Sequence, residues 1–226
     1  MTAASGSLFD RLRTAAGPEW TRYTRHEFVR RLADGTLPEA SFRHYLIQDY
    51  LFLIHFARAY ALAVYKSDTL ADMRQAGASL SAILDLEMGL HVQFCAGWEL
   101  DEAAMAAAPE ATGTLAYTRF VLERGMAGDL LDLHAALAPC IVGYAEIAEE
   151  IIADPATRLE GNPYRAWIEM YAGREYRDVA AAEIAQIDRL AERRGGAARF
   201  DDLARTFTIA SRLEAGFWDM GLGLLP

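Results

Sequence analysis

Cysteine and lysine are scarce in this 226-residue sequence, and both absences restrict the function. The two cysteines, Cys95 and Cys140, are too few for a disulfide framework, so we expect a protein of a reducing compartment. Lys66 is the one lysine, the arginines are scattered, and the formal net charge is −10. Because nucleic-acid binding depends on basic clusters that neutralise phosphates, the composition argues against a nucleic-acid partner.

Long hydrophobic runs are missing as well. Residues 1–10 contain no apolar segment of the kind found in signal peptides, and no later run reaches membrane-spanning length without a charge. Hydrophobic residues make up 53% of the chain and charged residues 24%, which is the balance of an ordinary soluble globular protein. We therefore expect a soluble, cytoplasmic protein that does not contact membranes.

The sequence also lacks the alternating apolar and polar pattern of β-strands. Apolar residues instead recur at steps of three and four almost everywhere, which is typical of amphipathic helices. We predict helices over residues 7–16, 19–32, 38–66, 69–98, 129–153, 176–193 and 200–221, with further helices beginning near residues 112 and 162. No repeat is visible, and the expected fold is a single-domain, all-α helical bundle spanning residues 1–226.

The helix predicted at 129–153 carries a cysteine on its apolar face. Cys140 and Tyr144 lie four residues apart, so they should stack on the same face. Pro139 precedes the cysteine, and a proline inside a helix is expected to kink it and to leave backbone groups open beside the thiol. These residues alone indicate either a reactive thiol or an inert buried one.

Two carboxylates interrupt apolar faces in the same way. Asp49 and Glu214 each lie among hydrophobic residues of a long predicted helix, and Cys140 does so on a third. Inward-facing polar groups of a bundle build a ligand site in its core, so we expect these three to share one pocket. The aromatic residues on inward faces, which fit a flat ligand but are equally typical of a packed core, are Phe52, Tyr117, Tyr144 and Tyr171.

Short motifs along almost the whole chain carry a family resemblance. They are Gln48-Asp49-Tyr50, His55-Phe56-Ala57-Arg58, Ala116-Tyr117-Thr118, Pro139-Cys140, Gly143-Tyr144-Ala145-Glu146-Ile147, Trp167-Ile168, Tyr171-Ala172, and Glu214 followed by Phe217-Trp218-Asp219-Met220. In this order they resemble the TenA family, also called thiaminase II. The resemblance implies a haem-oxygenase-like all-α fold, a homotetramer, and neither haem nor metal as cofactor.

The resemblance also implies a reaction and a role for each site residue. Family members hydrolyse aminomethylpyrimidine to hydroxymethylpyrimidine and ammonia in thiamin salvage, and they also cleave thiamin with the thiazole as leaving group. By position, Cys140 matches the nucleophile, Glu214 the acid/base, and Asp49 the carboxylate that holds the pyrimidine's amino group and ring nitrogen. Tyr117, Tyr144 and Tyr171 match tyrosines of the pocket. Phe52 stands where many members have tyrosine, so it keeps the ring but lacks the hydroxyl.

Two other functions stay open at this point. One is a metal-dependent oxygenase that uses Glu87 and His91 with His55 or His134. Di-iron bundles supply Glu-x-x-His from two helices, whereas Glu87 and His91 are four residues apart and occur once, so we expect a buried ion pair or hydrogen bond between them. The other is a non-catalytic pyrimidine-binding or regulatory protein. The acidic composition and the lack of a DNA-reading motif argue against direct action on transcription.

Overall fold

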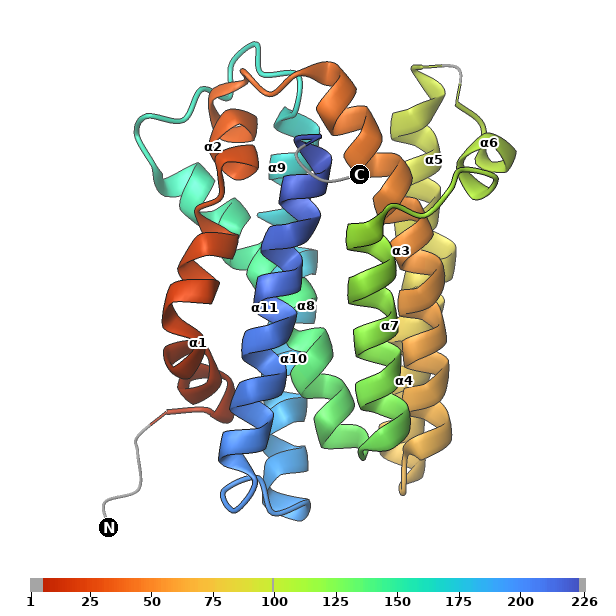
Figure 1. Ribbon diagram of the computed structural model, residues 1–226, viewed down its shortest axis with the longest axis vertical. Coiled ribbons are helices and arrows are strands. Elements are labelled where there is room, and N and C mark those ends of the chain that lie inside the picture. The colour runs from red at the N-terminus through yellow and green to blue at the C-terminus, as the bar shows by residue number, and fades with distance from the viewer. Residues whose placement is uncertain (1–5, 99, 224–226) are drawn as a thin grey trace.

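The computed structural model describes residues 6–98 and 100–223, and within these ranges the chain forms helices and no strand. The elements are α1 (Leu8–Thr24), α2 (Glu27–Asp34), α3 (Glu39–Lys66), α4 (Leu70–Ala82), the π-helical turn η1 (Ile83–Glu87), α5 (Met88–Ala96), α6 (Glu102–Ala106), α7 (Thr112–Ala127), α8 (Leu130–Ala153), α9 (Arg165–Tyr171), α10 (Arg174–Arg193) and α11 (Phe200–Gly221). The predicted all-α bundle is confirmed (Figure 1).

Helix α8 forms the centre of the bundle. It packs against α7, α10 and α11, while α1 packs on α11 and α3 packs on α4 and α7 (Figure 1). Leu133, Leu137 and Ile147 of α8 are completely buried. Burying an aliphatic side chain of this size contributes about 1.5–3 kcal/mol, so packing of this central helix is a principal source of stability.

Helix α8 is also long and apolar enough to cross a membrane, with a mean hydropathy of 1.4. However, 89% of its apolar window is buried inside the bundle. That degree of burial is the property of a core helix, because a membrane-spanning helix would present much of this surface to lipid.

Helix α8 contains Pro139 and continues through it to Ala153. Pro139 is buried, and the Tyr23 hydroxyl of α1 donates a hydrogen bond to its carbonyl at 3.2 Å. The backbone next to Cys140 therefore takes a bond from a neighbouring helix, while the kink predicted at this proline stays a prediction.

The helix predicted at 69–98 contains an irregular turn. Helix α4 passes into the π-helical turn η1, where the Met88 amide bonds the Ile83 carbonyl five residues back, and the chain continues as α5. A π-helical turn holds one more residue than an α-helical turn, so it changes the direction in which the later side chains point. No residue pattern in the sequence signalled this turn.

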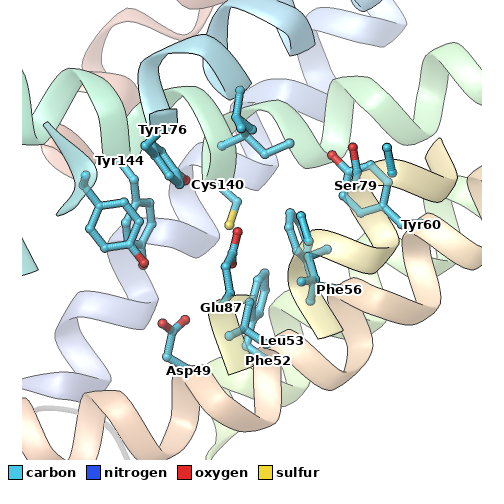
Figure 2. Close-up of a pocket in the computed structure, with 16 residues that line it drawn as sticks. Asp49, Phe52, Leu53, Phe56, Tyr60, Ser79, Glu87, Cys140, Tyr144 and Tyr176 are labelled. Carbon is cyan, nitrogen blue, oxygen red and sulfur yellow. The ribbon is translucent and has the colours of Figure 1, made fainter. Parts of the chain in front are cut away.

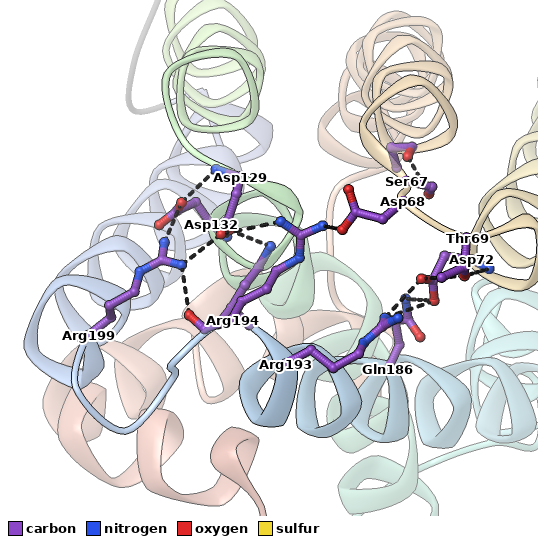
Figure 3. A network of polar contacts seen from close by, with 12 residues as sticks. Ser67, Asp68, Thr69, Asp72, Asp129, Asp132, Gln186, Arg193, Arg194 and Arg199 are labelled. Atoms are coloured by element: carbon purple, nitrogen blue, oxygen red, sulfur yellow. Dashed lines mark hydrogen bonds and ion pairs between the residues drawn. The ribbon is translucent and has the colours of Figure 1, made fainter.

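A polar network holds the far end of the bundle together (Figure 3). Asp129 and Asp132 form a capping box at the start of α8, and Arg199 bonds both carboxylates at 2.8 and 2.5 Å. Arg193 of α10 reaches Asp72 of α4 at 2.9 and 3.0 Å. Charge-assisted bonds of this kind tie the start of α8 to the start of α11 and the end of α10 to the start of α4.

Candidate active site

A cavity of about 230 Å³ lies inside the bundle beside the middle of α8 (Figure 2). Room for one water needs only about 10–15 Å³, so a ligand of several heavy atoms fits. Its walls come from α3, α4, η1, α8, α9 and α10, and they consist of Asp49, Phe52, Leu53, Phe56, Tyr60, Ala78, Ser79, Ala82, Ile83, Glu87, Cys140, Ile141, Tyr144, Tyr171, Tyr176 and Val179. Five of the seven predicted site residues are therefore in this wall.

Cys140 points its sulfur into the cavity (Figure 2). Burial raises the pKa of the thiol well above its ordinary value, and the negative charges of Glu214, Asp49 and Glu87 raise it further. A thiolate is the reactive form of cysteine. The surroundings of the sulfur therefore favour the protonated thiol, and Cys140 needs a neighbouring base and a bound positive or electron-poor group to become a nucleophile.

Glu214 lies behind Cys140, outside the cavity wall. Its carboxyl is 1% exposed and accepts a hydrogen bond of 2.8 Å from the Tyr117 hydroxyl. Burial raises the pKa of Glu214 to about 8, although hydrogen bonds with Tyr117 and Cys140 oppose the increase. Glu214 and Tyr117 therefore form a second layer that contacts the cavity through the cysteine, an arrangement that the sequence did not predict.

Asp49 forms the opposite wall and is held by two side chains. The Tyr45 hydroxyl donates to its Oδ2 at 3.2 Å, and His91 Nε2 lies 2.6 Å from the same oxygen. His91 Nδ1 lies 2.9 Å from the Glu87 backbone carbonyl, which can only accept, so Nδ1 carries a proton. An ionised Asp49 can only accept, so its contact with Nε2 places a second proton there and makes His91 an imidazolium.

The protonation of His91 agrees with its surroundings. Burial alone would lower the pKa of His91, but the hydrogen bond to Asp49 and the charge of that carboxylate outweigh burial and raise it. The expected buried ion pair is formed by His91, but its carboxylate partner is Asp49 and not Glu87. Glu87 contacts the ring through its backbone carbonyl, because α5 follows the π-helical turn.

Aromatic rings make up much of the rest of the wall. Tyr144 and Tyr171 lie side by side with ring centroids 4.9 Å apart, and Phe52 covers another part of the cavity. The Phe52 ring centroid is 5.1 Å from that of Tyr117, which places Phe52 between the cavity and the second layer. Flat apolar walls of this kind suit a flat heteroaromatic ligand.

The sequence analysis did not assign three further residues of this region to the pocket. Tyr60 and Tyr176 line the cavity, and Glu87 points its carboxyl into it (Figure 2). Tyr60 lies four residues after Phe56 on the inward face of α3, a spacing that was available as a signal. The direction of Glu87 was not predictable, because it depends on the π-helical turn.

The side chains considered for a metal do not gather in one place. His55 lies near Glu110 and Arg119, at 3.0 and 2.9 Å, His134 bonds Glu183 at 2.7 Å, and His91 bonds Asp49. Across residues 6–98 and 100–223, no group of three or more His, Cys, Asp and Glu side chains is arranged to hold a metal ion. The ligand set considered for an oxygenase is therefore not assembled in this part of the chain.

Comparison with known proteins agrees with this geometry. The profile of the TENA/THI-4/PQQC family matches residues 13–224. An aminopyrimidine aminohydrolase from Halalkalibacterium halodurans is 34% identical over 218 residues, which cover 96% of this chain and 94% of the relative. A crystal structure from Silicibacter sp. TM1040, described as a TenA family transcription regulator, is 46% identical with a TM-score of 0.91 and covers 98% of this chain and 99% of that one.

A more distant structure shows the fold alone. A domain of unknown function with a heme oxygenase-like fold from Shewanella denitrificans is 13% identical with a TM-score of 0.71, and the match covers 98% of this chain and 94% of that one. The expected haem-oxygenase-like fold is thus confirmed. With the family profile covering nearly the whole sequence, and with relatives 34% and 46% identical along their full lengths, the chain belongs to the TENA/THI-4/PQQC family.

Proposed function

We propose that this protein is an aminopyrimidine aminohydrolase of the thiaminase II type, which acts in salvage of the thiamin pyrimidine. The observation that carries the proposal is the position of the Cys140 sulfur: it faces an aromatic cavity that Asp49 also lines, and Glu214 lies directly behind it. Addition to an electron-poor ring requires a nucleophile, a group that binds the ring, and an acid or base that moves protons. The thiol of Cys140, the carboxylate of Asp49 and the carboxyl of Glu214 supply these three groups. No metal or other cofactor takes part in the proposed reaction.

Substrate binding uses the Asp49 wall. An aminopyrimidine presents an amino group and a ring nitrogen along one edge, and a carboxylate accepts hydrogen bonds from both when the ring nitrogen is protonated. Asp49 is oriented for this by Tyr45 and by the imidazolium of His91. Phe52, Tyr144 and Tyr171 enclose the ring faces, and Tyr117 holds Glu214 in place.

The chemistry begins with transfer of the Cys140 proton to Glu214 or to the bound ring. The thiolate then adds to a ring carbon, the ring loses its aromaticity, and the exocyclic group leaves with the electrons of the bond that held it. Water adds to the exocyclic carbon, and the sulfur departs as the ring becomes aromatic again. With a pKa of about 8, Glu214 is able to give and take a proton near neutral pH.

Replacement of the sulfur tests this proposal. The Cys140→Ala variant should lose ammonia release from aminomethylpyrimidine by at least about 10³-fold, as expected when a covalent nucleophile is removed. It should still bind hydroxymethylpyrimidine in a calorimetric titration, because Asp49 and the aromatic walls remain. Cys95→Ala, which removes the other thiol from the core, is the matched control and should keep its turnover. Full hydrolysis by Cys140→Ala would refute the nucleophile assignment.

We also propose that the protein is cytoplasmic, that it consists of one domain, and that it forms a homotetramer. Support for self-association comes from exposed apolar side chains, among them Tyr65 at 84%, Met126 at 71% and Leu70 at 60%. Exposed apolar surface of this kind is a common feature of subunit interfaces. Light scattering after gel filtration measures the assembly, and a 25.0 kDa species would contradict the tetramer.

A further inference from the structure

Glu87 lies where two cavities adjoin. The first is the 230 Å³ cavity described above, and the second is a cavity of about 160 Å³ that includes His91, Met170 and Glu175. The residues common to both walls are Ala82, Glu87, Tyr171, Tyr176 and Val179. Glu87 is the acidic member of this shared wall, so any group passing from the Cys140 side toward the second cavity passes its carboxyl.

In the described part of the chain no side chain or backbone group makes a hydrogen bond to the Glu87 carboxyl, although the Glu87 backbone carbonyl accepts one from His91. Burial and the charge of Asp49 raise the pKa of Glu87 to about 7, against the opposing charge of His91. A buried carboxyl is stable when it is protonated or when a ligand bonds it. Figure 2 shows this group directed into the cavity that Cys140 and Asp49 line.

The backbone directs Glu87 to this position. It is the last residue of the π-helical turn η1, and π-helical turns inside α-helices are frequent at functional sites. The other buried glutamate of the region, Glu214, is bonded by Tyr117 and lies behind the sulfur, outside the cavity wall. Of the two acids, Glu87 is therefore the one placed beside the open space into which a leaving group moves.

We propose that Glu87 is the acid that protonates the leaving nitrogen of amine substrates, and that the second cavity receives the released group. This inference rests on the proposed function above. After the sulfur of Cys140 has added to the ring, the exocyclic carbon–nitrogen bond breaks and its electron pair stays on nitrogen. The nitrogen takes the Glu87 proton and leaves as ammonia. The water that then attacks the exocyclic carbon returns a proton to Glu87, so the step adds one water and releases one ammonia.

Comparison with thiamin distinguishes an acid that protonates the leaving group from a residue that every substrate requires. Its leaving nitrogen belongs to a quaternary thiazolium ring, which departs as a neutral thiazole and needs no proton. A leaving-group acid should therefore matter for aminomethylpyrimidine and be dispensable for the release of thiazole. Glu214, which serves the sulfur and the ring, should matter for both.

The experiment measures single-turnover release of ammonia from aminomethylpyrimidine and of thiazole from thiamin, in the wild type, Glu87→Gln and Glu192→Gln. Loss of a general acid lowers the rate by about 10²–10⁴-fold, and we expect that loss for ammonia in Glu87→Gln, with thiazole release within about 3-fold of wild type. The ammonia rate of the wild type should also fall above about pH 7, and Glu87→Gln should lack this decrease. Glu192→Gln, at an exposed position of α10 outside both cavities, is the matched control and should match wild type.

Other results overturn the inference. Equal losses on both substrates would make Glu87 a structural or general residue, and undiminished ammonia release by Glu87→Gln would exclude the role. Should Glu87→Gln fail to fold, Glu87→Asp carries the test, because it withdraws the acid by one methylene and should slow ammonia release more than thiazole release. A wild type inactive on both substrates would instead refute the proposed function, and this inference with it.

Discussion

The raised pKa of Glu214 should make the stability of the fold depend on pH. Its pKa is about 8 in the folded protein against an ordinary value of 4.5, because the carboxyl is buried. The folded state therefore holds this proton more tightly than the unfolded chain does. The stabilisation is complete below about pH 4.5 and is lost as the pH rises through about 8.

The structure gives a magnitude for this effect. At about 1.4 kcal/mol per pKa unit, the difference amounts to about 5 kcal/mol in full, of which about 3–4 kcal/mol falls between pH 5 and pH 8. Glu214→Gln keeps the shape of the protonated side chain and cannot ionise. Its unfolding free energy, relative to wild type, should therefore increase by about that amount between pH 5 and pH 8.

Urea denaturation of both proteins across this pH range measures the difference between their unfolding free energies. The contributions of titrating groups that the two proteins share cancel in this difference. Glu192→Gln, at an exposed position of α10, is the matched control and should run parallel to wild type. If Glu214→Gln also ran parallel to wild type, the carboxyl would not be held protonated by the fold, and the acid/base role derived from its pKa would lose its basis.

Three further substitutions test other parts of the structure. In Gly143→Ala the added Cβ would lie 2.3 Å from a ring carbon of Tyr23, so urea denaturation should show an unfolding free energy lower by about 1–3 kcal/mol. An unchanged denaturation midpoint would contradict this packing. Arg199→Gln removes the charged partner of the α8 capping box, so its melting temperature should fall, and the decrease should be smaller in high salt. A decrease that does not depend on salt would exclude an ionic origin. His91→Gln takes the imidazolium from Asp49 and should weaken hydroxymethylpyrimidine binding by about 10-fold in calorimetry; unchanged affinity would show that His91 does not orient Asp49.

The helical bundle was predictable because its pattern is local. Apolar residues at steps of three and four mark α3, α8 and α11, and the structure has these helices within a few residues of their predicted ends. Asp49, Cys140 and Glu214 stood out for the same reason, since each is a polar group on an apolar helical face. Their convergence on one region follows from bundle packing, in which apolar faces share one core.

Other features depend on contacts that a helical pattern does not contain. A helix was predicted to begin near residue 162, yet α9 begins at Arg165 with Tyr164 as its N-cap, and the Asn162 amide donates to the Leu32 carbonyl at 2.9 Å. The position of Glu214 behind Cys140 depends on how deeply α11 packs against α8. These outcomes are decided between helices far apart in sequence, so the residue spacing alone did not reveal them.

The π-helical turn also has a consequence for changes in chain length. The extra residue of this turn is absorbed by the five-residue bond from Met88 to Ile83, so deletion of one residue between Ile83 and Asp85 would regularise the turn and leave α5 close to its present orientation. A residue deleted between Met88 and Leu90 has no such turn to absorb it, and it would rotate the rest of α5 by about 100° and swing His91 away from Asp49. The chain should therefore tolerate a shortened π-helical turn better than a shortened α5.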